Sequence, residues 1–560
     1  MTDPVSETQP PPTRTEETGA VDSADATGTN EEPVDSAPPE DSGEPGDTSE
    51  PIDPNRWRSA LYPEDWTPGF TVDGRFLHDF SYAGYHYGEA DPPASPPGAV
   101  FDVTHYGADQ TGASDSTSAI QAAIDDASQR GGVVWLPAGE YRCDGLLSIT
   151  ASGVVLRGEG MERTRLFFTR SDQMTDRHHI MFSGHRSFGE RRPLAADGES
   201  RADTIRLEDT HGLSVGDEVE IGWVITEDFV AEHQMQGTWQ AFNGTWRPIF
   251  RRTIRAIDAD TVTLDVPLRY PAQIRDQASL RTVSGMLEEV GVQELAVSTV
   301  VDWDAAWTND RSHAITLSGV KNGWVWRVRS YASPNVRDDR DDHLQSGGVM
   351  VVHSRLVTVA EVTMEQAQNR GGGGNGYLFE ISRSGEVLIQ DAVGRAGRHN
   401  FIQNWDFGTS GCVFLRTLSE DGVALQGKDW EWLEITGYSE FHHSLAMANL
   451  IDDSVAADGW KAVNRGDYSS GAGHAATQSV FWNLQGDGAI TSLQFGDGYV
   501  IGTEGLNVTT AVWDIFESAG TAPEDFVEGI DEGRHLDPPS LYEDQRKRRL
   551  ARGERRSDSK

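Results

Sequence analysis

The pattern of apolar and polar positions predicts a chain of short strands joined by glycine-containing turns. Strand-like apolar runs occur at 99–103, 133–137 and 152–160. Between the first two, the segment 118–127 places apolar residues at i, i+3, i+4 and i+7, which predicts a short amphipathic helix. Gly131-Gly132 follows and ends that helix. The order strand, helix, strand, strand indicates a capped, mostly β structure.

Short apolar runs return from about residue 282 and continue almost to the C-terminus. Their spacing of roughly 25–35 residues is typical of a solenoid whose coils carry loops of uneven length. Continuous apolar runs of this kind suit parallel strands that are covered by the interior of their own coil. The runs lie near residues 292–297, 315–325, 349–362, 377–389, 412–418, 445–451 and 480–484.

Three segments near the start of this pattern carry a family resemblance. They read FDVTHYGADQTGASDSTSAIQAAIDDA, GGVVWLPAGEYRC and SGVVLRGEG, and with their surroundings they span residues 99–168. This stretch resembles the opening of the pectate-lyase superfamily, except that 108–112 replaces the Gly-Asp-Gly turn usual there. The resemblance implies an all-β, right-handed parallel β-helix with an N-terminal capping helix, and a polysaccharide as its partner.

The remaining segments differ from the coils in composition and periodicity. Residues 203–270 alternate apolar and polar positions between polar turns, which predicts a small inserted β subdomain, and we expect the coils to fold without it. The predicted organisation is a disordered acidic Pro/Ser/Thr-rich tail (1–55), an aromatic lead-in (56–98), the cap and first coils (99–202), the insert (203–270), the main β-helix with a groove (271–515) and a charged C-terminal segment (516–560).

Charge and composition exclude some functions. The formal net charge of −42, from 47 Lys and Arg against 89 Asp and Glu, argues against a nucleic-acid partner. Apolar runs stay well short of the roughly 18 residues that a transmembrane helix needs. We expect an extracellular or surface-tethered protein whose export signal lies upstream of Met1. Cys143 and Cys412, far apart in the sequence, are expected to be buried thiols.

The first candidate for chemistry is a basic stretch in the main β-helix. Arg395, Arg398 and His399 lie within five residues, and Trp405 and Asp406 follow. Two guanidinium groups and an imidazole can neutralise a uronate carboxylate, and the indole offers a face on which a sugar ring can stack. The alternative is that these side chains form salt bridges with acids on neighbouring coils.

A second polar group falls on about two successive coils. Consecutive histidines in an extended chain point to opposite faces, so at most one of the pair at 442–443 can line a groove. Polar residues are crowded here among small ones, more densely than a structural coil requires. The candidates are Glu440, His442, His443, Lys461, Asn464, Arg465, Asp467 and His474.

The third candidate is an acidic loop. Asp338, Asp339, Asp341 and Asp342 provide four carboxylates in five positions. Clusters of carboxylate oxygens can bind Ca²⁺, and the family resemblance implies that such an ion can bridge protein and substrate. An ordinary solvated acidic loop is the alternative.

The function that these features favour is a polysaccharide lyase acting by β-elimination on a uronate-containing glycan. Arg398 or Lys461 is then the base and His399 or His443 the proton relay, while Arg465 completes the basic strip. Arg395, Trp405, Asp406, His442, Asn464, Asp467 and His474 would bind substrate. A glycoside hydrolase using two carboxylates from Asp406, Glu440, Asp452 and Asp467 is one alternative, and a non-catalytic tail-spike-like adhesin is another.

Overall fold

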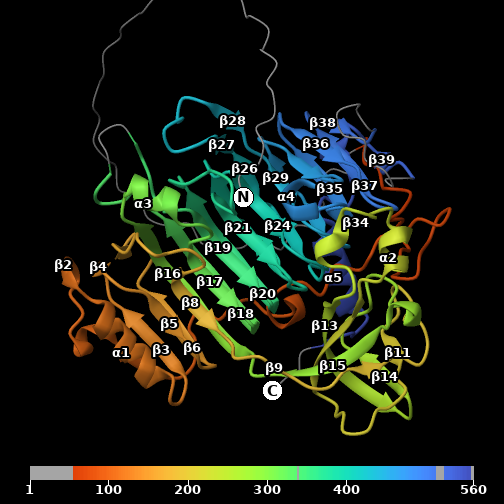
Figure 1. Cartoon of the computed structure of the whole chain (residues 1–560), viewed down its shortest axis with the longest axis horizontal. Coiled ribbons are helices and arrows are strands. Elements are labelled where there is room, and N and C mark those ends of the chain that lie inside the picture. Colours follow the sequence, from red (N-terminus) through yellow and green to blue (C-terminus); the bar gives the residue numbers. More distant parts are fainter. Residues whose placement is uncertain (1–53, 337–339, 512–522, 557–560) are drawn as a thin grey trace, which may run out of the picture. The chain divides into compact units, whose positions relative to one another are not determined.

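The computed structural model describes residues 54–336, 340–511 and 523–556 (Figure 1). The tail predicted at 1–55 lies outside the described residues except for its last two. Within the part of the chain that is described, no helix is long and apolar enough to cross a membrane. Cys143 and Cys412 are buried free thiols, as predicted.

Two long sheets of parallel strands form the body of the structure and confirm a parallel β-helix. In the ten-stranded sheet each strand pairs with the strand of the next coil, so the chain returns to the same face once per turn. Its strands are β5 (Leu147–Ile149), β8 (His178–Ser183), β17 (His313–Ser318), β19 (Gly347–Val352), β21 (Tyr377–Ser382), β24 (His399–Asn404), β29 (Ser439–Phe441), β33 (Trp460–Ala462), β36 (Ala489–Ser492) and β38 (Asn507–Thr509).

An 18-stranded sheet supplies the other faces of the coils. One continuous apolar core, from Phe101 in the first coil to Leu506 in the last, fills the interior between the sheets. The strands of this sheet are β1 (Ala99–Asp102), β2 (Thr111–Asp115), β3 (Gly132–Leu136), β4 (Gly139–Cys143), β6 (Val154–Gly158), β7 (Thr164–Phe168), β16 (Leu287–Thr299), β18 (Val320–Ser330), β20 (Arg355–Glu365), β22 (Leu388–Gln390), β23 (Val393–Arg395), β25 (Val413–Leu415), β26 (Leu418–Glu420), β31 (Leu450–Asp452), β32 (Val455–Ala456), β35 (Val480–Gln485), β37 (Tyr499–Glu504) and β39 (Phe526–Glu528).

The predicted capping helix is α1 (Thr117–Ala127). Ile120, Ala123, Ile124 and Ala127, the residues of the predicted apolar stripe, are fully buried and join the core of the coils. Because the helix covers the open end of that core, the first coil does not expose its apolar interior to water.

At the other end, α5 (Leu541–Ala551) packs on the outside of the last coils together with the aromatic lead-in. Asp452 of β31 holds the N-terminal end of α5. Its carboxylate accepts hydrogen bonds from the Ser540 hydroxyl at 2.7 Å and from the backbone N–H groups of Leu541 and Tyr542 at 3.1 and 2.9 Å. Asp452 therefore caps α5 from a buried position, which removes it from the carboxylates available for hydrolysis.

The inserted subdomain is a seven-stranded antiparallel sheet (Figure 1). Its strands extend on both sides of the predicted range 203–270, because β9 and β10 precede it and β15 pairs back against them. The strands are β9 (Ser187–Phe188), β10 (Arg192–Pro193), β11 (Thr204–Arg206), β12 (Glu218–Val224), β13 (Trp246–Asp258), β14 (Thr261–Leu264) and β15 (Ser279–Ser284), and the helix α2 (Glu227–Glu232) lies between β12 and β13.

Buried ion pairs join the insert to the coils. Arg252 of the insert lies 3.1 Å from Glu386 of the solenoid, and both side chains are fully buried. Arg269 approaches the same carboxylate at 3.5 Å, while Arg355 of β20 pairs with Asp265 of the insert. The insert therefore supplies the counter-charges of Glu386 and Arg355, and folding of the coils without it stays a prediction.

Two buried histidines lie where the insert meets the coils. The His233 ring is hydrogen-bonded to the Phe229 carbonyl at 2.7 Å and to the Tyr270 hydroxyl at 2.9 Å, and the His474 ring donates to the His233 carbonyl at 3.0 Å. Burial lowers the pKa of His233 to about 4 and the pKa of His474 to about 4. Both rings are therefore neutral in the folded protein at neutral pH.

Acidification should destabilise this interface. A histidine whose folded pKa is depressed contributes stability above its unfolded pKa of about 6.5 and loses that contribution as the pH falls towards its folded pKa. We expect each of the two to cost about 2 kcal/mol between about pH 7.5 and pH 5. Calorimetric melting at both pH values should show a smaller loss in His474→Gln than in the natural protein; an equal loss would contradict the assignment.

Candidate functional site

A cavity of about 450 Å³ lies against the ten-stranded sheet near its C-terminal end. Glu440, Lys461, Thr491 and Thr509, from β29, β33, β36 and β38, are paired in register across it. Parallel neighbours lie about 4.8 Å apart, so these four side chains form a row with one residue per coil. The cavity is lined by Tyr438, Glu440, Lys461, Val463, Asn464, Arg465, Tyr468, Thr491, Leu493 and Thr509.

Strand alternation explains why this row faces outward. Phe441, Trp460, Ala462 and Ile490 belong to the interior core. Successive side chains of a strand point to opposite faces, so Glu440 and Lys461, next to these core residues, point out of the coil. The sequence folds locally in this way because apolar positions alternate with polar ones across the short strands.

Lys461 lies at the centre of the cavity wall. Its Nζ atom lies 3.4 Å from the centre of the Tyr438 ring, a cation–π contact. Burial lowers the pKa of Lys461, the attraction of Glu440 opposes this, and the charge of Arg465 lowers it further. A lysine amine with a depressed pKa is a better proton acceptor near neutral pH than an ordinary surface lysine.

Arg465 and the segment after it form a second wall. The Arg465 guanidinium donates to the His442 carbonyl at 2.7 Å and to the Ser469 hydroxyl at 3.3 Å. The short helix α4 (Tyr468–Gly471) follows, and its Tyr468 side chain is 65% exposed at the edge of the cavity. A positive charge and an aromatic face thus stand on the same side of the cavity.

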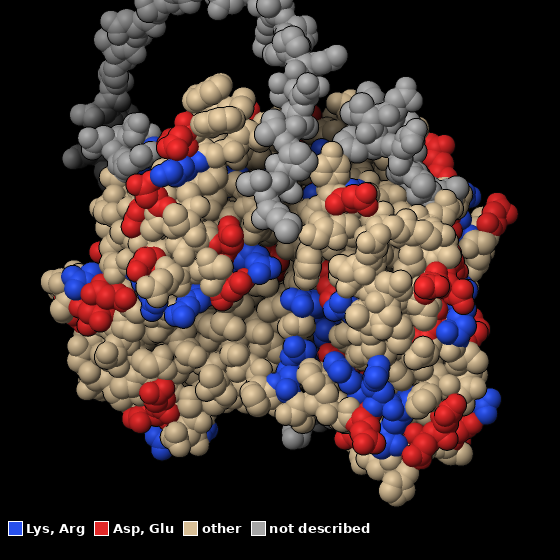
Figure 2. Space-filling view, in the orientation of Figure 1, with Lys and Arg blue, Asp and Glu red and all other residues tan. Residues whose placement is uncertain are grey.

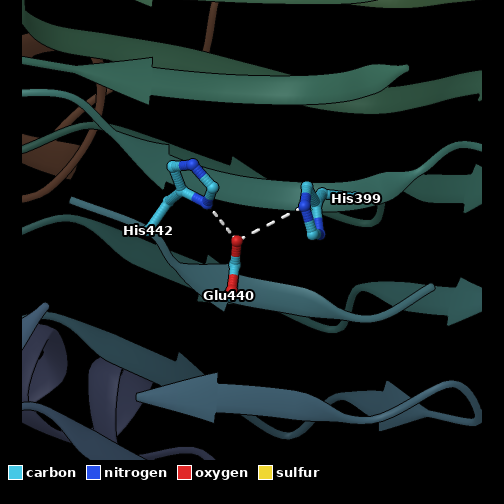
Figure 3. A group of neighbouring side chains, drawn as sticks. All are labelled: His399, Glu440 and His442. Carbon is cyan, nitrogen blue, oxygen red and sulfur yellow. Dashed lines mark hydrogen bonds and ion pairs between the residues drawn. The ribbon is translucent and has the colours of Figure 1, made fainter. Parts of the chain in front are cut away.

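His399, Glu440 and His442 form a buried cluster next to the cavity, and Glu440 is also part of the cavity wall (Figure 3). Oε1 of Glu440 lies 3.3 Å from Nε2 of His399 and also contacts Nδ1 of His442. All three side chains are buried. Burial raises the pKa of Glu440, but the charges of His442, His399 and Arg465 outweigh burial and hold that pKa well below its usual range.

Of the five residues predicted as catalytic, three lie at this site. Lys461 and Arg465 line the cavity, and His399 lies behind it. Arg398 is not among the lining residues: its guanidinium donates to the Gly371 carbonyl at 2.7 Å, although its charge still acts on Tyr438.

His443 turns away from the others. Its ring centre lies 4.0 Å from that of Trp405, and its nitrogens are hydrogen-bonded to the Ser444 hydroxyl at 2.7 Å and the Ser469 carbonyl at 2.9 Å. The two neighbouring histidines thus point to different faces, as their spacing predicts. His442 belongs to the buried cluster, and His443 packs towards the insert.

Several residues predicted to bind substrate are held in structural contacts outside the cavity. Arg395 forms ion pairs with Glu365 at 2.6 Å and with Glu420, the alternative that the sequence left open.

Four other residues predicted to bind substrate contact the insert, whose position the sequence does not reveal. Asp406 pairs with Arg247 at 2.9 Å, and Asp467 accepts a hydrogen bond from Thr238 at 3.0 Å. Trp405 packs against Phe242, and His474 is bonded to His233. Asn464 lines the cavity and His442 lies behind it.

The acidic loop gives no grouped ligand set among the described residues. Asp338 and Asp339 lie outside the described residues. Asp342 is buried against Arg340 at 3.1 Å, whereas Asp341 is 67% exposed and 3.6 Å from His343. Binding of Ca²⁺ at this loop stays a prediction.

Sequence reasoning missed Tyr438, Tyr468, Thr491, Leu493 and Thr509 of the cavity wall. Thr491 and Thr509 follow Lys461 at one-coil intervals, which is the signal that could have found them. Reading that signal requires the exact strand register, and loops of different length between the coils hide the register in the sequence.

Further basic side chains lie just after the C-terminal ends of strands in the same sheet. Arg186, His353 and Arg383 follow β8, β19 and β21, and the charges of Arg383, Arg186 and Arg251 join burial in lowering the pKa of His353. Figure 2 shows Lys and Arg side chains gathered in a hollow near the middle of this face, beside the insert. A strongly acidic protein thus presents a local basic surface along the ten-stranded sheet.

The fold and the site together define the class of this protein, which is a parallel β-helix with a basic cavity on one sheet. A family model described as rhamnogalacturonase A/epimerase, pectate lyase-like, matches residues 100–190. This match confirms the pectate-lyase-like resemblance of the first coils. It ends long before the cavity residues and therefore carries no information on their chemistry.

Individual proteins are similar to this chain to different extents. Mannuronan C5-epimerase AlgE3 of Azotobacter vinelandii is 51% identical over 72 residues, which are 11% of this chain and only 4% of that protein. The tailspike gp54 of Acinetobacter baumannii bacteriophage AP22, solved with a capsular saccharide, is 10% identical over 77% of this chain and 72% of its own, with a TM-score of 0.31. An iota-carrageenase solved with carrageenan fragments is 11% identical over 77% of this chain and 61% of its own, with a TM-score of 0.31.

Proposed function

We propose that this protein is a polysaccharide lyase that cleaves a uronate-containing glycan by β-elimination in the cavity of the ten-stranded sheet. The observation that carries the proposal is Lys461, an amine with a lowered pKa that lines the same cavity as Arg465. The volume of about 450 Å³ falls within the range of sites that bind small ligands. The basic surface beyond the cavity favours an acidic chain as the substrate.

Three side chains have roles in the proposed reaction. The Lys461 amine takes the proton from C5 of the uronate, a C4–C5 double bond forms, and the C4–O bond breaks. Arg465 pairs with the uronate carboxylate, on which negative charge grows during proton removal. Tyr438 protonates the leaving oxygen; burial raises its pKa to about 12, so its hydroxyl is protonated at neutral pH.

Lys461 is a better candidate for the base than Arg398. A guanidinium keeps its proton in proteins, whereas a lysine amine loses its proton readily when it is partly buried. Lys461 also lines the cavity, whereas Arg398 points its guanidinium at the Gly371 carbonyl.

The hydrolase alternative has weaker support. A glycoside hydrolase needs two carboxylates on either side of the scissile bond. Among the described residues that line the cavity, Glu440 is the one carboxylate. Asp406 and Asp467 are bonded to side chains of the insert, and Asp452 caps α5.

A second candidate is C5 epimerisation, which the local similarity to AlgE3 favours. The first step would be the same removal of the C5 proton. Return of a proton to the opposite face of C5, without loss of the C4 oxygen, would then invert the sugar.

The test is incubation of the purified full chain with polymannuronate, polyguluronate and polygalacturonate in D₂O. A lyase produces the ultraviolet absorbance of a C4–C5 double bond, and an epimerase produces C5-deuterated sugar without that absorbance. New reducing ends without either signal would indicate a hydrolase. Retention on a glycan column without any product would indicate an adhesin, and these last two outcomes would overturn the proposal.

A further inference from the structure

The buried group behind the cavity has the composition of a metal site. We propose that His399, Glu440 and His442 bind one divalent transition-metal ion, of which Zn²⁺ is the type case. The inference goes beyond the proposed function and does not depend on it, because metal binding can be measured without any substrate. Two imidazole nitrogens and one carboxylate oxygen are a ligand set common for such ions.

The distance between His399 and Glu440 fits this coordination, whereas Oε1 of Glu440 and Nδ1 of His442 are in direct contact and would move apart when the ion binds. The three ligand atoms lie within 4.8 Å of one another, and Nε2 of His399 lies 3.3 Å from Oε1 of Glu440. Ligands of a tetrahedral zinc ion, bound at about 2.0–2.1 Å, stand about 3.3 Å apart. Figure 3 shows both rings turned towards the carboxylate from opposite sides.

Hydrogen bonding at His399 provides an independent argument. Its Nδ1 atom lies 2.6 Å from the Tyr438 carbonyl, which only accepts hydrogen bonds, so Nδ1 carries the proton. In a neutral imidazole Nε2 is then an unprotonated acceptor. This atom is buried, has no hydrogen-bond partner and lies 3.3 Å from Oε1 of Glu440.

A cation placed between these two atoms would be bound by both of them. The arrangement also matches the usual orientation of metal-binding histidines, whose second nitrogen donates to a backbone carbonyl or a carboxylate. The strands enforce it: β24 and β29 are neighbours in the sheet, and His442 directly follows β29.

The residues around the cluster determine how tightly we expect it to bind a metal ion and whether water or substrate can reach that ion. Glu440 also lines the cavity, so a fourth ligand position can open towards water or substrate. The charges of Lys461 and Arg465 oppose a dication nearby, and we therefore expect weaker binding than at a structural zinc site. The competing arrangement is a protonated His399 paired with Glu440 and no metal.

The experiment titrates the metal-free full chain with Zn²⁺ and Co²⁺ by calorimetry. Excess Ca²⁺ is present throughout to occupy the all-oxygen sites of this acidic protein. We expect one ion per chain, and a visible Co²⁺ spectrum typical of nitrogen ligands. Glu440→Gln and His442→Gln should each weaken binding about tenfold or more, whereas His443→Gln, the neighbouring histidine outside the cluster, should bind as the natural protein does.

Three results would overturn the proposal. They are the absence of one-to-one binding in the natural protein, a Co²⁺ spectrum of an all-oxygen octahedral site, and unchanged binding in a folded Glu440→Gln protein. If the substitutions prevent folding, the Co²⁺ spectrum of the natural protein still decides between the outcomes. A failed lyase assay has no bearing on any of them.

Discussion

Lys461→Ala is expected to abolish turnover of a polyuronate while the melting temperature stays within a few degrees of the natural value. Removal of a general base typically costs about 10²–10⁴-fold in rate. Lys461 points out of the coil into the cavity, so its loss leaves the interior packing intact. The measurement is kcat on the polysaccharide that gives the strongest signal, together with the melting temperature of each variant.

Two variants control this result. Lys428→Ala removes a lysine that pairs with Asp304 on the surface, at 2.6 Å, and should leave kcat unchanged. Arg398→Ala should reduce kcat less than Lys461→Ala, because Arg398 does not line the cavity. If Lys461→Ala lowered activity only in proportion to a loss of folded protein, Lys461 would be structural and the proposed site would be wrong.

Glu386→Ala should cause a large loss of stability. Glu386 is fully buried and lies 3.1 Å from Arg252 and 3.5 Å from Arg269, both on the insert. Its removal leaves buried guanidinium groups without a counter-charge, which typically costs about 3–5 kcal/mol. Denaturant unfolding followed by circular dichroism measures this change in the free energy of unfolding.

Glu504→Ala is the matched control for this change. Glu504 pairs with Arg534, whose side chain is 64% exposed, so breaking this pair should cost less than about 1 kcal/mol. A similar small cost for Glu386→Ala would show that the insert is not anchored by these ion pairs. The insert could then be removed without loss of the coils.

The sequence determined the architecture because the signals for it are local. Apolar runs between glycine turns, and the i, i+3, i+4, i+7 stripe of α1, depend on neighbouring residues alone and predicted the parallel β-helix and its cap correctly. The insert was recognisable for the same reason, since its period-two pattern differs from the runs of the coils. Its full extent was not, because β9, β10 and β15 become strands by pairing with one another across long stretches of sequence.

Only the tertiary structure decided which polar residues meet. Glu440 and Lys461 lie side by side because β29 and β33 pair in one register, and a shift of either strand by one residue would turn its side chain into the core. Asp406, Asp467 and His474 looked equally suitable in the sequence, but the docked insert engages all three. Which polar side chains stay available for chemistry depends on strand register and on the docking of the insert, and both are set by contacts between residues far apart in the chain.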